Sequence, residues 1–418
     1  MKRLLSLTLL LAISLVSYAQ LSPEMDAYLR AFPQRAAFNI HSYEFLPLQD
    51  TPAPHGFKPF YISHYGRHGS RSHSSDKPYV LLRDCLQAAA EEGIITPSGD
   101  SLLACAKQMI EFHDGMDGRL TPRGAREHEQ LARRMYRRYP EVFRHGEVHA
   151  ISSDVTRCLV SMSAFTSALS SCKSDLTITW DCGAKYQRSI ISPKFPAETM
   201  KKASGVAHGP LTDIPIDTMA VFKRFFKDPV RGKALAGKSR NFVSAIFSLA
   251  QFAEAYDIEE NRFTFLPWDA VTTAYARHAL SFYLGRCNSV PFGDEHLPWI
   301  KPLVMDVIRK ADEAIAGAPV AADLRFGHDM PFLALCSCFG LEGYGYPRLT
   351  AEEAYRNWNG TLHCPFAANL QIIFYKDRKG GVLVKFLTNE RETLIPQLEA
   401  FSGPYYRWED VKAEALKR

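Results

Sequence analysis

The sequence has no pair of cysteines spaced as C-x-x-C, although it contains nine cysteines among 418 residues. Pairs at that spacing are the usual mark of a structural zinc site, so no such site is expected. The odd number of cysteines also leaves at least one thiol without a disulfide partner. The cysteines therefore predict neither a zinc site nor a fully paired disulfide framework.

Beyond its first residues the sequence also lacks a long apolar run. Residues 4–16 are apolar, but such a segment of about 13 residues is shorter than the roughly 20 that a membrane-spanning helix needs. Lys2 and Arg3 precede the run, and small residues including Ala19 follow it, which is the pattern of a secretory signal. We therefore predict a signal peptide over residues 1–19, no membrane span, and export to the periplasm or the medium.

No large excess of one charge is present, because 50 Lys and Arg stand against 45 Asp and Glu, for a formal net charge of +5. Proteins that bind nucleic acid or anionic membrane surfaces usually carry a stronger basic bias, so neither is expected as the main partner. The arginine-rich segment 119–138 is interpreted as the solvated face of a helix. The oligomeric state is left open.

Strand and helix patterns alternate over most of the chain. Strands are expected at 59–64, 148–153, 176–181 and 322–329, and helices at 78–92, 101–113, 122–139 and after residue 153. A hairpin follows near the C-terminus, where "NLQIIFY" and "VLVKFLT" are joined by "KDRKGG". This alternation predicts an α/β sandwich whose mixed sheet is partly parallel.

Between residues 186 and 300 the strand patterns disappear and helical stretches alternate with loops. We therefore predict a mostly helical insertion at 186–300 within an α/β catalytic domain formed by 20–185 and 301–418. The insertion is rich in basic residues, among them Lys201, Lys202, Lys223 and Arg231. They are candidates to contact outer charges of a polyanionic substrate, although a solvated basic face is the alternative.

Polar clusters follow three of the predicted strands, at "HYGRHGSR", "SSDVTR" and "GHD". The carboxyl ends of parallel strands lie at one edge of a sheet, which is where ligands bind in such folds. A metal site built from His64, His68 and His73 is disfavoured, because the arginines between them would repel a cation. A surface network of salt bridges is a further alternative.

An anion site accounts for the clusters best. Guanidinium groups make bidentate hydrogen bonds to phosphate oxygens and stay charged at all relevant pH values. Arg67, Arg71 and Arg157 each lie just beyond a strand and are expected to converge on one phosphate. A neutral histidine beside such a phosphate can act as a nucleophile, and the carboxyl of Asp329 can act as a general acid.

The motif "RHGSR" with a distant "HD" resembles the histidine acid phosphatases, whose pattern is RHGxRxP followed by HD or HAE. The segments "GRLTPRGAREHEQLARRMYRRYP" and "SSDVTRCLVSMSAF" are similar to further family segments, so the resemblance covers most of the chain. "CPFAANLQIIFYKD" with "VLVKFLTNERE" resembles the C-terminal strands of the family's inositol polyphosphate phosphatase branch, whereas "HDM" resembles the branch that contains many acid phosphatases and phytases. Two departures are His73 in place of the family proline and "HDM" in place of HAE.

The resemblance implies a phosphoglycerate mutase-like, three-layer fold and an enzyme that needs no cofactor and no metal. It implies that His68 is the nucleophile and Asp329 the proton donor. The phosphoryl oxygens would be bound by Arg67, Arg71, Arg157 and His328.

The expected function is the hydrolysis of phosphate monoesters through a phosphohistidine, with inositol polyphosphates such as phytate as substrates. Two alternatives stay open. One is a broad-specificity acid or sugar-phosphate phosphatase, and the other is a phosphate-ester binding protein without turnover.

Overall fold

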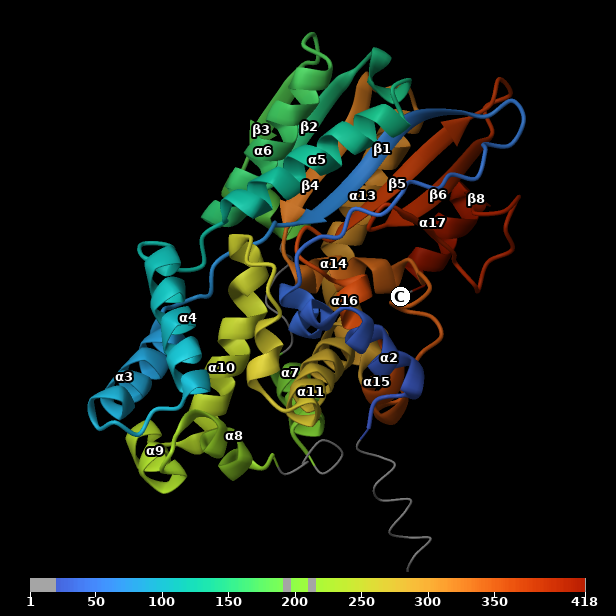
Figure 1. Ribbon diagram of the computed structural model, residues 1–418. Helices are drawn as coiled ribbons and strands as arrows, with labels where there is room; N and C mark the ends of the chain where they lie inside the picture. The colour runs from blue at the N-terminus through green and yellow to red at the C-terminus, as the bar shows by residue number, and fades with distance from the viewer. Residues whose placement is uncertain (1–19, 191–196, 210–215, 418) are drawn as a thin grey trace, which may run out of the picture.

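The structure is a computed structural model that describes residues 20–190, 197–209 and 216–417. The predicted signal peptide at 1–19 lies outside the described residues. The described chain forms a sheet covered by helices, drawn at the top of Figure 1, and a group of helices packed below one edge of that sheet. Among the described residues, no helix has the length and apolar character needed to cross a membrane.

The sheet has eight strands, in the order β3-β2-β4-β1-β5-β6-β7, with β8 paired to β6. The first four strands in this order pair parallel with one another, and every pairing from β1–β5 onward is antiparallel. The prediction of a mixed, partly parallel sheet is therefore confirmed. The strands are β1 (Lys58–Arg67), β2 (Glu147–Ser152), β3 (Ile178–Asp181), β4 (Val320–Gly327), β5 (Asn369–Lys376), β6 (Val382–Thr388), β7 (Arg391–Thr393) and β8 (Tyr405–Arg407).

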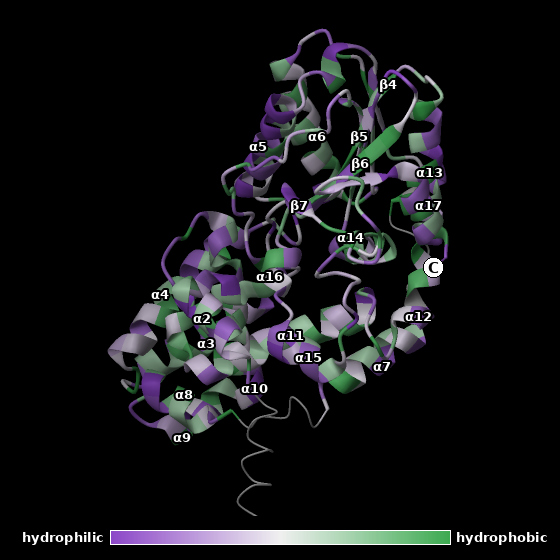
Figure 2. Ribbon diagram, turned by 90° about the vertical axis from the view of Figure 1, so that its right-hand side faces the viewer, coloured by the Kyte–Doolittle hydropathy of each residue, from purple (hydrophilic) through white to green (hydrophobic). Residues whose placement is uncertain are grey.

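Helices cover both faces of this sheet, which makes the predicted three-layer sandwich. One face packs against α5 (Pro122–Arg138) and α6 (Thr156–Cys172). The other packs against α13 (Lys301–Ile315), α14 (Asp329–Cys338) and α17 (Trp408–Leu416). Strand β4 is buried along nearly its whole length and is hydrophobic in Figure 2, as expected of a central strand with both faces covered.

The helix α5 starts where the sequence predicts, because the Thr121 side chain accepts a hydrogen bond from the amide of Gly124. Its outer face is strongly hydrophilic (Figure 2). The interpretation of that face as wholly solvated is wrong in one respect. Arg134 forms an ion pair with Glu390 and Arg138 forms one with Asp50, so these two arginines attach the helix to the C-terminal strands.

The lower group of helices draws on more of the chain than residues 186–300. One apolar core joins α8 (Thr218–Phe225), α9 (Pro229–Ala236) and α10 (Ser239–Ala253) to α3 (Lys77–Glu91) and α4 (Pro97–His113). A second helix pair, α7 (Ala197–Ala207) and α11 (Trp268–Arg286), packs on the core beneath the sheet. The division of the chain into two domains stays a prediction.

Candidate active site

Three strands end together at the sheet edge that faces the lower helices. Arg67 at the end of β1 pairs in register with Gly327 of β4, and Ser152 of β2 pairs with Phe326. The amide of His68 then donates to the carbonyl of Gly327 at 3.0 Å. The structure therefore brings together the three polar clusters that the sequence places after separate strands.

The loop after β1, residues 67–71 (the RHG loop), is held against the start of α5. A Cβ atom on Gly69 would lie 2.3 Å from the carbonyl oxygen of Gly124, and one on Gly124 would lie 2.2 Å from that of Ser70. Both contacts are impossible for a larger residue, so the two backbones can meet only at glycines. This close approach explains the glycine of "RHG" and the glycine of "LTPRG".

A buried carboxylate fixes the same loop from α5. Glu127 accepts hydrogen bonds from the Ser70 amide at 2.8 Å and from the Ser70 hydroxyl at 2.6 Å. Burial raises the pKa of Glu127, although these hydrogen bonds oppose the effect. Glu127 is not among the predicted site residues, but its spacing of four and eight residues from the buried Leu131 and Met135 places it on the inner face of the helix.

His68 has the protonation state that a nucleophile needs. Its Nδ1 lies 2.9 Å from the carbonyl oxygen of Gly69, which can only accept, so Nδ1 carries the proton and Nε2 keeps its lone pair. Burial, and then the charges of Arg67 and Arg157, lower the pKa of His68 well below its usual range. The imidazole is therefore neutral.

The three predicted arginines lie close enough to this imidazole that the charge of each lowers its pKa. Among the described residues, the Nε atoms of Arg67, Arg71 and Arg157 are buried and have no hydrogen-bond partner. Burial and the neighbouring Arg67 lower the pKa of Arg71 to about 10, so it stays a cation at neutral pH. Buried Arg67 and half-buried Arg71 and Arg157, each with an unused Nε donor beside a neutral imidazole, form a site for an anion.

Arg67 is the most tightly fixed of the three. Its Nη1 atom donates to the carbonyl oxygens of Asn39, Cys364 and Pro365 at 2.5, 3.0 and 2.9 Å. Its Nη2 atom lies 3.0 Å from Oδ2 of Asp329. Because one nitrogen is bound to the main chain, the orientation of the guanidinium is set before any ligand arrives.

His328 and Asp329 follow β4, as predicted. Burial, and then the charge of Arg157, lower the pKa of His328 to about 4, so this ring is neutral and can contact an anion only through an N–H. Burial alone would raise the pKa of Asp329, but the charges of Arg67 and Arg286 lower it below its ordinary value. Without a ligand, Asp329 is therefore ionised rather than protonated.

His64 and His73, which the sequence offered with His68 as possible metal ligands, do not join the cluster. His64 is fully buried against Phe165 and Phe326, on the side of the sheet that α6 covers. His73 packs against Phe252 of α10, and its Nδ1 lies 2.7 Å from the carbonyl oxygen of Ser75. His73 thus closes the turn at the position of the family proline, and no group of three potential metal ligands occurs among the described residues.

Two site residues were not predicted from the sequence. Asn39, in the 3-10 segment η1 (Pro33–Ile40), donates from Nδ2 to Oδ2 of Asp329 at 3.1 Å. Arg286, at the end of α11, is buried and stacks on Phe282, with its guanidinium carbon 3.9 Å from the ring centre. Neither lies in a motif, and only the folded chain brings them to Asp329.

Two of the basic residues named in the insertion are held in ion pairs. Lys202 pairs with Glu295 and Arg231 pairs with Glu92. Helices α8 and α9 pack against α4 and α3, well below the sheet edge in Figure 1. Arg286 of α11, which also belongs to residues 186–300, does affect the site, because its charge lowers the pKa of Asp329.

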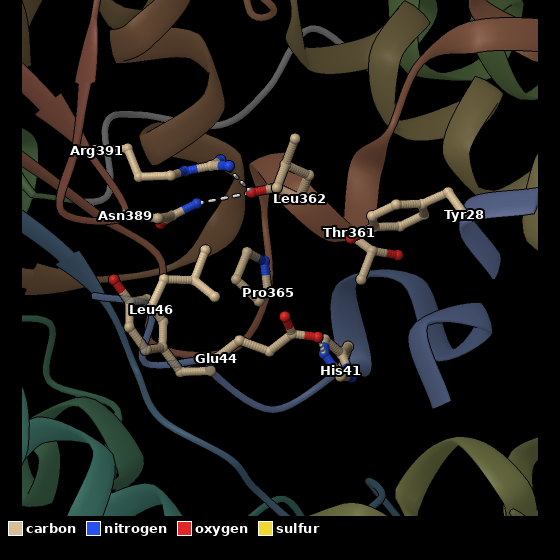
Figure 3. Close-up of a pocket in the computed structure, with 10 residues that line it drawn as sticks. Tyr28, His41, Glu44, Leu46, Thr361, Leu362, Pro365, Asn389 and Arg391 are labelled. Atoms are coloured by element: carbon tan, nitrogen blue, oxygen red, sulfur yellow. Dashed lines mark hydrogen bonds and ion pairs between the residues drawn. The ribbon is translucent and has the colours of Figure 1, made fainter. Parts of the chain in front are cut away.

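A separate pocket lies near the cluster but does not contain it (Figure 3). Its lining includes His41, Glu44, Pro365, Asn389 and Arg391. The side chains of Asn389 and Arg391 donate to the carbonyl oxygen of Leu362, so these donors are already used. The candidate site is therefore the arginine cluster around His68 and not this pocket.

Residues 66–197 match the family model described as histidine phosphatase superfamily (branch 2). This segment contains the RHG loop, α5 and Arg157. No curated protein matches the whole sequence significantly.

Several solved structures share the fold. A Bifidobacterium longum multiple inositol polyphosphate phosphatase, in complex with inositol hexasulfate, has a TM-score of 0.74 at 16% identity, over 90% of this chain and 97% of that one. The phytase from D. castellii has a TM-score of 0.68 at 14% identity, over 92% and 85%. A Hafnia alvei phytase, in complex with myo-inositol hexakis sulphate, has a TM-score of 0.52 at 14% identity, over 87% and 98%.

Proposed function

We propose that this chain is a member of branch 2 of the histidine phosphatase superfamily, whose model matches residues 66–197, and that it is an exported phosphomonoesterase in which His68 is the nucleophile. The observation that carries the proposal is the neutral imidazole of His68, with its lone pair on Nε2, among three guanidinium groups that have unused donors. Export is proposed from the signal pattern of residues 1–19.

In the first step, Nε2 of His68 attacks the phosphorus atom in line with the departing oxygen. Arg67, Arg71 and Arg157 bind the equatorial oxygens, where charge is concentrated in phosphoryl transfer. The P–O bond breaks, and the alkoxide takes a proton from Asp329. The products are an alcohol, a phosphohistidine and a carboxylate.

In the second step, water attacks the phosphohistidine while the Asp329 carboxylate takes one of its protons. This releases inorganic phosphate and restores both residues.

The ionised state of Asp329 in the ligand-free protein is compatible with this role. A bound phosphate dianion adds negative charge beside the carboxyl and competes with it for Arg67. Both effects raise the pKa of Asp329, so substrate binding favours the protonated, donating form.

The proposed substrates are inositol polyphosphates, including phytate. Two relatives in fold were solved with inositol hexasulfate or hexakis sulphate, which have the shape and charge of such substrates. A broad-specificity acid or sugar-phosphate phosphatase is the second candidate. It is favoured by Lys202 and Arg231, two basic residues of the predicted insertion, which are paired with Glu295 and Glu92 rather than left free for outer phosphates.

The test is phosphate release by the purified protein from phytate and from a simple aliphatic monophosphate, with EDTA present throughout. We expect a higher kcat/KM for phytate, and an advantage that shrinks as salt rises, because outer phosphates bind through screened charges. Preference for the monophosphate would favour the broad phosphatase. Binding of phytate without release would favour a binding protein.

A further inference from the structure

The N-terminal arm, residues 33–44, precedes every motif that the phosphatase resemblance uses. It consists of η1 and the extended residues 41–44. Asn39 in this arm is a buried polar residue, only 8% exposed, and it contacts the proposed acid directly. An upstream segment therefore takes part in the catalytic cluster.

Asn39 makes two contacts in this cluster. Its Nδ2 donates to Oδ2 of Asp329 at 3.1 Å, and its main-chain oxygen accepts from Nη1 of Arg67 at 2.5 Å. The same Oδ2 atom also faces Nη2 of Arg67 at 3.0 Å. Two N–H donors thus converge on Oδ2, whereas Oδ1 receives no hydrogen bond from the described residues.

We infer that Asn39 is a positioning residue that keeps Oδ2 of Asp329 as an acceptor and so places the transferable proton on Oδ1. Oδ2 already accepts from two N–H donors, so a proton on Oδ2 would remove one of these hydrogen bonds. The carboxyl proton is therefore more stable on Oδ1. The inference rests on the proposed function, since it assigns the atom through which Asp329 acts.

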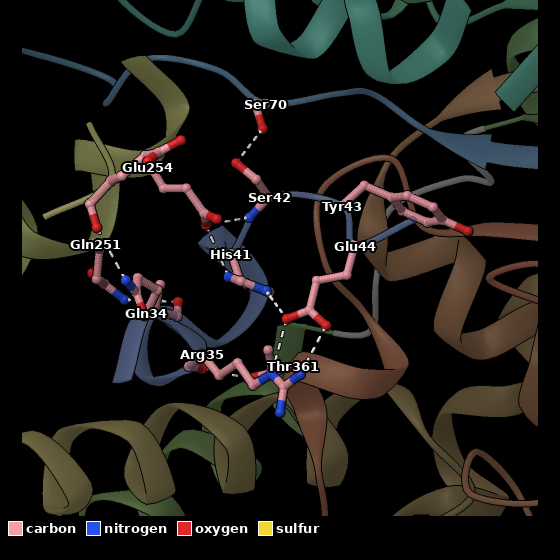
Figure 4. A network of polar contacts seen from close by, with 12 residues as sticks. Gln34, Arg35, His41, Ser42, Tyr43, Glu44, Ser70, Gln251, Glu254 and Thr361 are labelled. Carbon is pink, nitrogen blue, oxygen red and sulfur yellow. Dashed lines mark hydrogen bonds and ion pairs between the residues drawn. The ribbon is translucent and has the colours of Figure 1, made fainter. Parts of the chain in front are cut away.

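The arm is held firmly enough for this role (Figure 4). The imidazole of His41 lies between two carboxylates, with Nε2 2.8 Å from Glu44 and Nδ1 2.9 Å from Glu254. Burial opposes the charged form, but the two carboxylates raise the pKa of His41 to about 9. The ring is therefore a cation over the working pH range and binds the arm to the helical region through Glu254.

The arm is also tied to the RHG loop and to the packed core. The hydroxyl of Ser42 lies 2.9 Å from that of Ser70, as Figure 4 shows. Phe38, next to Asn39, has a φ of 58°, which is unfavourable for a residue with a side chain. Its ring packs edge-on against Tyr275 and Phe282, so tertiary packing enforces the backbone that presents Asn39.

Removing the Asn39 donor leaves the carboxylate of Asp329 less stabilised, so the pKa of Asp329 rises. The fall of kcat on the alkaline side of its pH profile (the alkaline limb) then moves to higher pH. Removing the donor also frees Oδ2 to take the proton in the unproductive position, which lowers kcat for substrates that need protonation. The charged or titratable groups around Asp329 in the wild type are Arg67, Arg71, Arg157, Arg286, His328, Tyr65 and Cys364, and the ring of His68 packs against that of His328.

The test compares Asn39→Leu and Asn39→Asp with Gln34→Ala, a matched control on η1 whose half-buried side chain donates to the main-chain oxygen of Glu259. Each variant is assayed against pH on phytate and on an activated aryl phosphate, and folding is checked by circular dichroism. We expect Asn39→Leu to lose about tenfold or more in kcat on phytate and less than about threefold on the aryl ester. Gln34→Ala should match the wild type.

Asn39→Asp keeps the size of the side chain, so it tests the role of the Asn39 donor even if Asn39→Leu does not fold. A second carboxyl beside Asp329 should move the alkaline limb further upward. Equal losses on both substrates with an unmoved limb would overturn the inference and leave Asn39 with a structural role alone. Failure of the proposed function is distinct: the wild type would then release no phosphate from either substrate.

Discussion

The Nδ1 atom of His68 donates to the carbonyl oxygen of Gly69, its own neighbour in the chain, at 2.9 Å. This contact fixes the tautomer, so Nε2 keeps the lone pair and is the nitrogen that would attack phosphorus in the proposed reaction. Replacing His68 by Ala should lower kcat at least about a thousandfold, because removing a nucleophile removes the reaction path. Phosphorus NMR of quenched wild-type protein should show phosphate on Nε2 of the imidazole.

The control for this prediction is His149→Ala, a partly exposed histidine on β2 away from the cluster. It should keep both the activity and the trapped phosphate. Phosphate trapped on Nδ1, or activity of His68→Ala within tenfold of the wild type, would contradict the assignment.

Asp329→Asn should separate substrates by their leaving groups. The amide keeps the shape of the carboxyl but cannot deliver a proton, and an inositol alkoxide leaves poorly without one. We expect a loss of about 10²-fold or more in kcat on phytate and a much smaller loss on an activated aryl phosphate. Equal losses on the two substrates would mean that Asp329 only shapes the site.

The contact between the RHG loop and α5 predicts that Gly124→Ala harms both stability and activity. The added Cβ would meet the Ser70 carbonyl at 2.2 Å, so the loop must move. Overpacking of this kind lowers the free energy of unfolding by about 1–3 kcal/mol. Displacement of His68 should lower kcat as well, by roughly tenfold for a shift of a few tenths of an ångström.

A matched control is Gly205→Ala on α7, where the new Cβ would have no atom within 4 Å. That change should raise the free energy of unfolding by about 0.5–1 kcal/mol, since alanine favours helix, and leave kcat unchanged. Urea unfolding and initial rates measure the two effects. Wild-type kinetics in Gly124→Ala would show that the loop tolerates the displacement.

Acid should destabilise the protein through two histidines beneath the site. Burial lowers the pKa of both His64 and His128 to about 3. Because the unfolded chain binds these protons near pH 6.5 and the folded chain does not, stability is fully present above pH 6.5 and falls as pH drops toward 3. Each histidine should lower the free energy of unfolding by about 3 kcal/mol between pH 7 and pH 4.

His128→Phe removes one of these titrations, and the ring would lie among the aromatic rings of Phe165 and Phe326. The difference in Tm between pH 7 and pH 4 should therefore be smaller in this variant than in the wild type. His145→Phe, outside the core, is the control and should keep the wild-type difference. An unchanged difference in His128→Phe would show that other groups govern acid unfolding.

Much of the fold could be predicted from local patterns. The segments of β1, α5 and the β5–β6 hairpin are predicted to within a few residues, because alternation, helix caps and turn glycines act over short stretches of chain. The arginine-rich face of α5 was harder to interpret. Its ion pairs with Asp50 and Glu390 join residues far apart in sequence, and no local pattern indicates such partners.

The sequence by itself determined the chemistry of the site, since the arginines, His68 and Asp329 follow strands whose carboxyl ends must share one edge of a parallel sheet. The tertiary structure alone decided the electrostatic state of these groups. Burial and neighbouring charges make His68 neutral and Asp329 ionised, and these depend on distances between distant segments. For the same reason only the folded chain shows that Asn39 and Arg286 belong to the site, because no motif carries them and packing alone brings them to Asp329.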